Sequence, residues 1–111
     1  MAVAILSASM DEGGWMIREE VLATLARHAE ELRGMGVVWL ALFGSVARGE
    51  ERDDSDVDLL VELERPAGYL KLAAVSRRLE EILGRPVDLV PRKALRPALQ
   101  EQVLAEAIRA A

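Results

Sequence analysis

The sequence contains no cysteine among its 111 residues. Disulfide bridges and thiolate metal sites are therefore excluded, and the composition is compatible with a reducing compartment. An excess of basic residues is also lacking, because 14 Lys and Arg stand against 19 Asp and Glu and the formal net charge is -5. We therefore expect neither a nucleic acid nor a membrane as a direct partner, because nucleic acids and anionic bilayers attract a basic face.

The N-terminal segment MAVAILSASM is apolar but lacks a basic start. It is also shorter than the roughly 20 apolar residues that cross a bilayer. We interpret the protein as cytoplasmic, with an N-terminal extension over residues 1–14 and one domain over residues 15–111. Hydrophobic residues make up 51% of the chain, which is enough to build a core.

No internal repeat or low-complexity linker divides the chain, so its elements can be assigned in order. Apolar residues at helical spacing predict helices over Trp15–Arg33, Tyr69–Leu83 and Leu95–Ile108. Strands are predicted over Val37–Phe43, Asp56–Leu63 and Pro86–Val90. The order helix, strand, strand, helix, strand, helix predicts an α/β (α+β) fold, a small mixed β-sheet with helices packed on it.

Two of these elements allow a more specific expectation. The first strand is the continuous apolar run VVWLALF, which predicts a strand covered on both faces. The last helix has an apolar side that includes Leu99, Val103 and Ile108. We expect this side to pack on the sheet of its own domain, although it could instead contact a partner.

Carboxylates are concentrated where the second and third predicted strands begin. Asp56 and Asp58 are two residues apart, so they share one face of a strand with Cα atoms about 6.5 Å apart. Asp88 lies in PVDLV, where a charge is costly unless it is paired or bound to a metal. If the third strand lies beside the second, the three carboxylates converge as in a magnesium site that handles phosphates.

Simpler interpretations apply to part of this pattern. Residues 50–54 are an acidic stretch that is best explained as a solvated loop. Asp88 alone could form a structural salt bridge, with Arg85 or Arg92 within reach. An EF-hand is excluded because Leu59 stands where that loop needs glycine. The only histidine, His28, lies at the edge of the first helix's apolar stripe and is assigned a structural or surface role.

A glycine turn follows the first strand and precedes the acidic loop. Gly44 would let a phosphate approach the backbone, and Ser45 adds a hydroxyl donor. The stretch GSVARGE is not a Walker A loop, because Glu50 occupies the position of the essential lysine. There is no G-x-G-x-x-G dinucleotide motif either.

Gly44 and Ser45, a spacer of ten residues, and then Asp56-Val57-Asp58 match the signature of the nucleotidyltransferase superfamily that includes DNA polymerase beta. The longer string LALFGSVARGEERDDSDVDLLVEL resembles the minimal nucleotidyltransferases (MNT or MntA-like proteins) of bacteria and archaea. The later GRPVDLV is similar to the strand that carries the third aspartate of that family.

This resemblance implies a role for each matching residue. Asp56, Asp58 and Asp88 would be catalytic and would bind two Mg²⁺ ions. Gly44 and Ser45 would hold the triphosphate of ATP, and Arg48 would have either a phosphate-binding or a structural role. The reaction would be in-line attack on the α-phosphate with release of pyrophosphate.

The same resemblance implies a partner. Minimal nucleotidyltransferases are antitoxins that neutralise a HEPN ribonuclease toxin by binding it and by adenylylating a protein hydroxyl, often that of a tyrosine. Two alternatives stay open, namely a binding-only antitoxin module and a transferase for a small-molecule acceptor. A homodimer or a hetero-oligomer is compatible with each of them.

Overall fold

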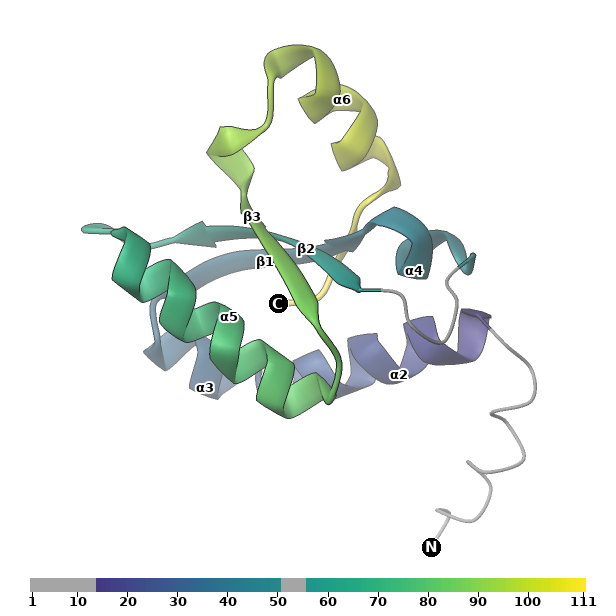
Figure 1. The fold of residues 1–111 in the computed structure, drawn as a ribbon, viewed down its shortest axis with the longest axis horizontal. Coiled ribbons are helices and arrows are strands. Elements are labelled where there is room, and N and C mark those ends of the chain that lie inside the picture. The colour runs from purple at the N-terminus through teal and green to yellow at the C-terminus, as the bar shows by residue number, and fades with distance from the viewer. Residues whose placement is uncertain (1–13, 51–55) are drawn as a thin grey trace, which may run out of the picture.

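A computed structural model describes residues 14–50 and 56–111 of the chain (Figure 1). The predicted extension, apart from Gly14, and most of the predicted acidic loop lie outside the described residues. Six helical elements are present in the described part: α2 (Gly14–Arg27), α3 (Ala29–Gly34), α4 (Gly44–Arg48), α5 (Tyr69–Leu83), the 3-10 helix η2 (Arg92–Ala94) and α6 (Pro97–Glu106). The strands there are β1 (Val37–Phe43), β2 (Val57–Leu63), β3 (Val87–Pro91) and β4 (Ile108–Arg109).

The strands form one mixed sheet in the order β3-β2-β1-β4. β1 is antiparallel to both β2 and β4, whereas β2 and β3 are parallel. The parallel pair is connected through α5, as the crossover between parallel strands requires. The predicted α/β fold with a small mixed sheet is confirmed.

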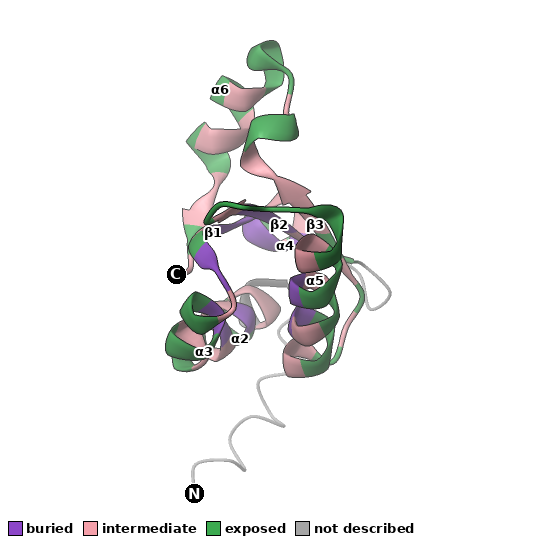
Figure 2. Ribbon diagram, turned by 90° about the vertical axis from the view of Figure 1, so that its left-hand side faces the viewer, coloured by how far each residue is buried: buried purple, intermediate pink, exposed green. Residues whose placement is uncertain are grey.

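Helices α2, α3 and α5 cover one face of the sheet, and α6 stands on the opposite side (Figures 1 and 2). The core lies between the sheet and the helices α2, α3 and α5. Its buried helix residues are Val21, Leu25, Leu32, Val75 and Leu79, and its strand residues include Leu40, Leu42, Val57, Leu59 and Val61. These buried helix residues recur at the helical spacing from which the helices were predicted.

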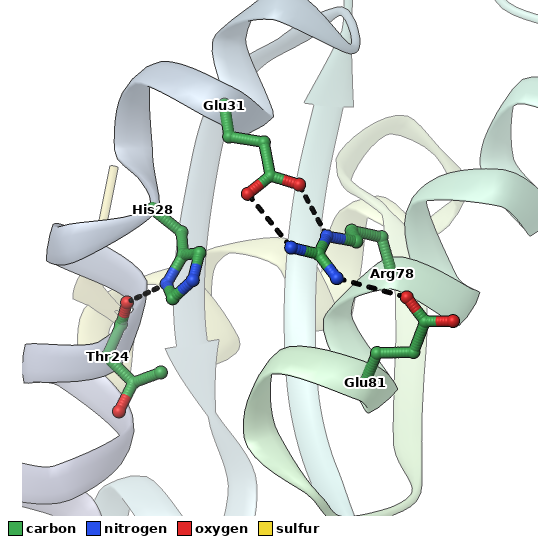
Figure 3. A network of polar contacts seen from close by, with 5 residues as sticks. All are labelled: Thr24, His28, Glu31, Arg78 and Glu81. Carbon is green, nitrogen blue, oxygen red and sulfur yellow. Dashed lines mark hydrogen bonds and ion pairs between the residues drawn. The ribbon is translucent and has the colours of Figure 1, made fainter.

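An ion-pair network on the surface joins two of the covering helices (Figure 3). Arg78 of α5 donates to both carboxylate oxygens of Glu31 in α3, and its Nη1 lies 3.1 Å from Oε1 of Glu81. His28, between α2 and α3, has Nδ1 2.9 Å from the carbonyl oxygen of Thr24. Of the structural or surface role that was predicted for His28, this contact within the turn supports the structural one.

The first predicted helix differs from the observed one. It is divided into α2 and α3, with a turn at His28 where the backbone leaves helical geometry (φ -104°, ψ 12°). Leu25 of α2 and Leu32 of α3 are both buried in the core, so the turn at His28 keeps the two helices on the same face of the sheet. None of the helices in the described part is long and apolar enough to cross a membrane.

The last predicted helix is shorter than expected. Arg96 is extended before Pro97, as residues preceding proline usually are, and Pro97 starts α6. Ala107 ends the helix in an extended conformation, so Ile108 lies in β4 and pairs with Leu42 of β1 instead of continuing the helix.

Two expectations about burial were also wrong in part. α6 has no fully buried residue, and Leu99 is 47% exposed, so its packing on the sheet is only partial. Strand β1 is covered on both faces over Leu40–Leu42, but Val38 is 50% exposed. A strand register that shifts between Val37 and Trp39 turns Val38 outward.

Candidate functional site

The three predicted carboxylates lie at the amino-terminal ends of β2 and β3. Asp58 of β2 and Asp88 of β3 are direct partners in the parallel register, with adjacent strands about 4.8 Å apart. Asp56 lies two residues before Asp58 and is exposed. The strand begins at Val57 rather than at the predicted Asp56.

Alternation along β2 places Asp58 on the face opposite the main core. Val57 and Leu59, on either side of it, are fully buried under the covering helices. Asp58 itself is only half-buried. The side-chain alternation that was used to place Asp56 and Asp58 on one face of a strand therefore also separates Asp58 from the core residues beside it.

The electrostatics of Asp58 reflect this arrangement. Partial burial raises the pKa of Asp58, and the negative charges of Asp88 and Asp56 raise that pKa further. Arg48 acts in the opposite direction and lowers the pKa. The structure therefore concentrates negative charge at this end of the sheet without fully compensating it.

The glycine turn lies directly against Asp58. Phe43, the last residue of β1, pairs with Asp58, and Gly44 follows with φ +77°. A Cβ atom on Gly44 would overlap Oδ2 of Asp58 and lie 3.0 Å from its Cγ. Only glycine fits both the backbone conformation and the space, so the turn and the carboxylate form one unit.

The turn continues into α4, whose five residues begin at Gly44. The N–H groups in the first turn of a helix have no acceptor within the helix, so those of Gly44 and Ser45 are not used by α4 itself. Ser45 is half-buried, and its carbonyl oxygen accepts a hydrogen bond from the N–H of Glu50 at 2.8 Å. The predicted phosphate-binding residues thus stand next to the carboxylates.

Two contacts from distant parts of the chain hold α4, and the sequence analysis missed both. Arg18 of α2 donates through Nη1 to the carbonyl oxygen of Ala47 at 3.1 Å. Arg48 donates through Nε to Glu50 at 2.9 Å and through Nη1 to Glu106 of α6 at 3.4 Å. Neither Arg18 nor Glu106 belongs to a local motif, so no sequence pattern identifies them.

The proposed salt bridge between Asp88 and Arg92 is not formed. Arg92 instead lies over the ring of Trp39, 4.3 Å from its centroid, and its Nη1 is 3.5 Å from Oε1 of Glu62. Asp88 is exposed beside Asp58. The alternative prediction, that Asp88 forms a structural salt bridge with Arg92, is therefore wrong.

The carboxylates of Asp56, Asp58 and Asp88 offer oxygen ligands for a divalent cation. Within residues 14–50 and 56–111, no three carboxylate or imidazole side chains are gathered closely enough to enclose a metal ion. The donor chemistry is nevertheless suitable, because carboxylate oxygens are the ligands that Mg²⁺ prefers and the charges of Asp56 and Asp88 both act on Asp58. Asp58 and Asp88, on adjoining strands, therefore fit a divalent cation chemically, because their negative charges are not fully compensated within the protein.

Comparison with known proteins places this chain among nucleotide-transferring enzymes. The model of the nucleotidyltransferase domain family matches residues 23–110. A protein adenylyltransferase named MntA from Thermococcus cleftensis is 41% identical over 91 residues, which are 81% of this chain and 92% of that protein.

Solved structures agree with this comparison. A minimal nucleotidyltransferase is 49% identical, with a TM-score of 0.62, and the match covers 82% of this chain and 86% of that one. The fold is shared with an MNT antitoxin in complex with a tri-AMPylated HEPN toxin from Shewanella oneidensis. That match has 19% identity and a TM-score of 0.60, and it covers 82% of this chain and 71% of the other.

Proposed function

The chain belongs to the nucleotidyltransferase domain family and is a nucleotidyltransferase, and from this premise we propose that it transfers AMP from ATP to a hydroxyl group of a HEPN toxin. It would thereby act as the antitoxin of a toxin–antitoxin pair in the cytoplasm. The observation that carries the proposal is the packing of the Gly44 turn against Asp58, with Asp88 beside it. This unit joins a candidate phosphate-binding turn to two carboxylates at one end of the sheet, and Asp56 lies two residues before Asp58.

In the proposed reaction, the hydroxyl oxygen of the acceptor attacks the α-phosphorus of ATP. A new phosphorus–oxygen bond forms while the bond from the α-phosphorus to the bridging oxygen of the β-phosphate breaks. Pyrophosphate leaves, and AMP stays on the acceptor as a phosphodiester. Asp88, exposed beside Asp58, would orient the hydroxyl and accept its proton.

Asp56, Asp58 and Asp88 would hold Mg²⁺, with two ions expected. Bound Mg²⁺ supplies charge compensation for the triphosphate and for the attacking and leaving oxygens. Gly44 and Ser45 would bind the triphosphate through backbone N–H groups and the serine hydroxyl. Arg48, within electrostatic reach of Asp58, would add a positive charge at the same turn.

Support for the acceptor comes from the relatives. The protein that is 41% identical is named a protein adenylyltransferase, and the toxin in the related complex carries AMP. A HEPN protein encoded beside this chain's gene is therefore the expected substrate.

The test is co-expression of that HEPN protein with the wild-type chain or with an Asp56→Asn/Asp58→Asn variant, followed by intact-mass measurement of the toxin. We expect added AMP units only with the wild type. If the toxin is neutralised by the wild type without any change in mass, binding alone explains the activity and the transfer reaction is refuted.

A further inference from the structure

A groove of about 960 Å³ lies at the carboxyl end of β2, away from the carboxylates. The end of the strand, residues 64–68, the start of α5 and residues 91–93 line it. Asp58 is near the other end of β2, five residues or about 16 Å from Leu63. The proposed transfer reaction therefore leaves this groove unused.

Two exposed apolar side chains, those of Val38 and Tyr69, line this groove, and the exposed Leu70 follows Tyr69 in α5. Tyr69 and Leu70, at the start of α5, are 81% and 82% exposed, and Val38 in the groove lining is half exposed. Leu99 of α6 is the one other large apolar side chain with comparable exposure in the described part of the chain. Single exposed apolar residues are common, but a group of them beside a groove marks an interaction surface.

The charges around the groove have both signs. Glu64, Arg65 and Lys93 line it, and within the described residues none of their side chains forms an ion pair. An acidic partner could pair with Arg65 and Lys93 but not with Glu64. A second copy of this surface could pair with both signs of charge, because it offers its own Glu64 to a cation and its own cations to Glu64. In a two-fold interface, residue i of one protomer meets residue j of the other and j meets i, so adjacent opposite charges suit self-association.

This surface combines a hollow with apolar side chains that are exposed beside it. Tyr69 and Leu70 stand out beside a hollow, so each protomer offers both an apolar projection and a groove to receive one. We propose that this surface is the interface of a two-fold homodimer. Tyr69 and Leu70 of each protomer enter the groove of the other, and Arg65 lies opposite the partner's Glu64.

This arrangement leaves the carboxylates of both protomers accessible, because they lie toward the opposite end of β2. The dimer is independent of the transfer reaction, so either proposal can fail while the other stands.

The first test is sedimentation equilibrium of the purified chain over a concentration series. We expect a monomer–dimer equilibrium, and we expect the Tyr69→Ala/Leu70→Ser variant to raise the dissociation constant at least about tenfold, as loss of central contacts does. Leu99→Ser is the matched control, since it also removes an exposed leucine from a helix, and it should leave the constant unchanged. A wild-type chain that stays monomeric throughout, or equal effects of the two variants, overturns the proposal.

The second test uses charge reversal. Arg65→Glu and Glu64→Arg should each weaken the dimer, because each sets like charges opposite one another. An equal mixture of the two variants should regain the wild-type constant, since every pair in the mixed dimer is again of opposite sign. Failure of the mixture to recover rejects this interface. Groove substitutions that weaken toxin binding but not the dimer also reject it and assign the groove to the toxin.

Discussion

Asp58 and Asp88 occupy paired positions on the neighbouring parallel strands β2 and β3. Two carboxylates in this arrangement repel each other, and the charges of Asp88 and Asp56 raise the pKa of Asp58 beyond the effect of burial. A fold selected for stability alone gains nothing from this placement. The repulsion is consistent with residues kept for binding a cation.

Asp58→Asn should therefore stabilise the protein when no divalent cation is present. The raised pKa means that the folded state binds the Asp58 proton more tightly than the unfolded state does, so the ionised carboxylate lowers stability at neutral pH. We expect a higher midpoint of thermal unfolding in EDTA at neutral pH. The gain should shrink as the pH falls through the pKa of Asp58, because the wild-type carboxyl then becomes neutral as well.

Added Mg²⁺ gives the complementary result. The ion should raise the unfolding midpoint of the wild type but not that of Asp58→Asn, since ligands that bind only the folded state stabilise it. Glu101→Gln on the exposed surface of α6 is a control for general charge removal and should keep the wild-type response. An equal response to Mg²⁺ in Asp58→Asn would show that the ion binds elsewhere.

Gly44→Ala should impair both folding and nucleotide binding. The left-handed backbone at Gly44 costs a residue with a side chain about 1–2 kcal/mol, and the added Cβ would displace the Asp58 carboxylate. We expect a lower unfolding midpoint and weaker ATP binding by calorimetry. Gly34→Ala is the matched control, because a Cβ on Gly34 meets no atom within 4 Å and alanine favours the helix. Normal ATP binding by a folded Gly44→Ala protein would argue against the phosphate-binding turn.

Arg48→Ala separates nucleotide binding from attachment of α6. Arg48 contacts Glu50 and Glu106 on the surface, and it also acts electrostatically on Asp58. If it holds the triphosphate in both ground and transition states, KM for ATP should rise several-fold, with kcat little changed. Glu106→Ala removes the contact to α6 but keeps the positive charge of Arg48, so its KM should not rise. The same KM in Arg48→Ala as in the wild type would assign Arg48 a structural role only.

The network that joins α3 to α5 gives a prediction about stability alone. Hydrogen bonds from Arg78 lower the pKa of Glu31, so the pair stabilises the fold above the ordinary pKa of glutamate and loses its effect as the pH falls through the lowered value. Glu31→Gln should reduce the unfolding midpoint slightly at neutral pH and not at strongly acid pH. Because the pair is remote from the carboxylate site in sequence and contacts, transfer activity should be unaffected. A midpoint difference that persists at strongly acid pH would contradict this account.

Much of this arrangement follows from local sequence patterns. The bounds of β1 and α5 match the prediction, and period-two alternation correctly set Asp58 opposite the buried Val57 and Leu59. The bounds of these elements and the face on which a side chain lies depend on residues that are close in sequence. They can therefore be predicted from a single sequence.

Other features depend on contacts between distant residues. The short strand β4 exists because Ile108 and Arg109 reach the edge of β1, and nothing in their neighbourhood distinguishes them from the end of a helix. The Arg48–Glu106 pair likewise joins residues 58 positions apart. Such tertiary contacts override local helical preference and were not predictable from the residues alone.

Transfer of AMP can be distinguished from transfer of phosphate by following the two ends of ATP separately. The purified chain, Mg²⁺ and the HEPN protein encoded beside it are incubated with ATP labelled at either the α- or the γ-phosphate, and label on the HEPN protein is measured. We expect transfer of the α-label by the wild type and no transfer of the γ-label. Transfer by Asp56→Asn/Asp58→Asn should be at least about a thousandfold lower, since charge compensation worth several kcal/mol is lost. Transfer of the γ-label, or equal labelling by the double variant, would contradict the proposed transfer of AMP.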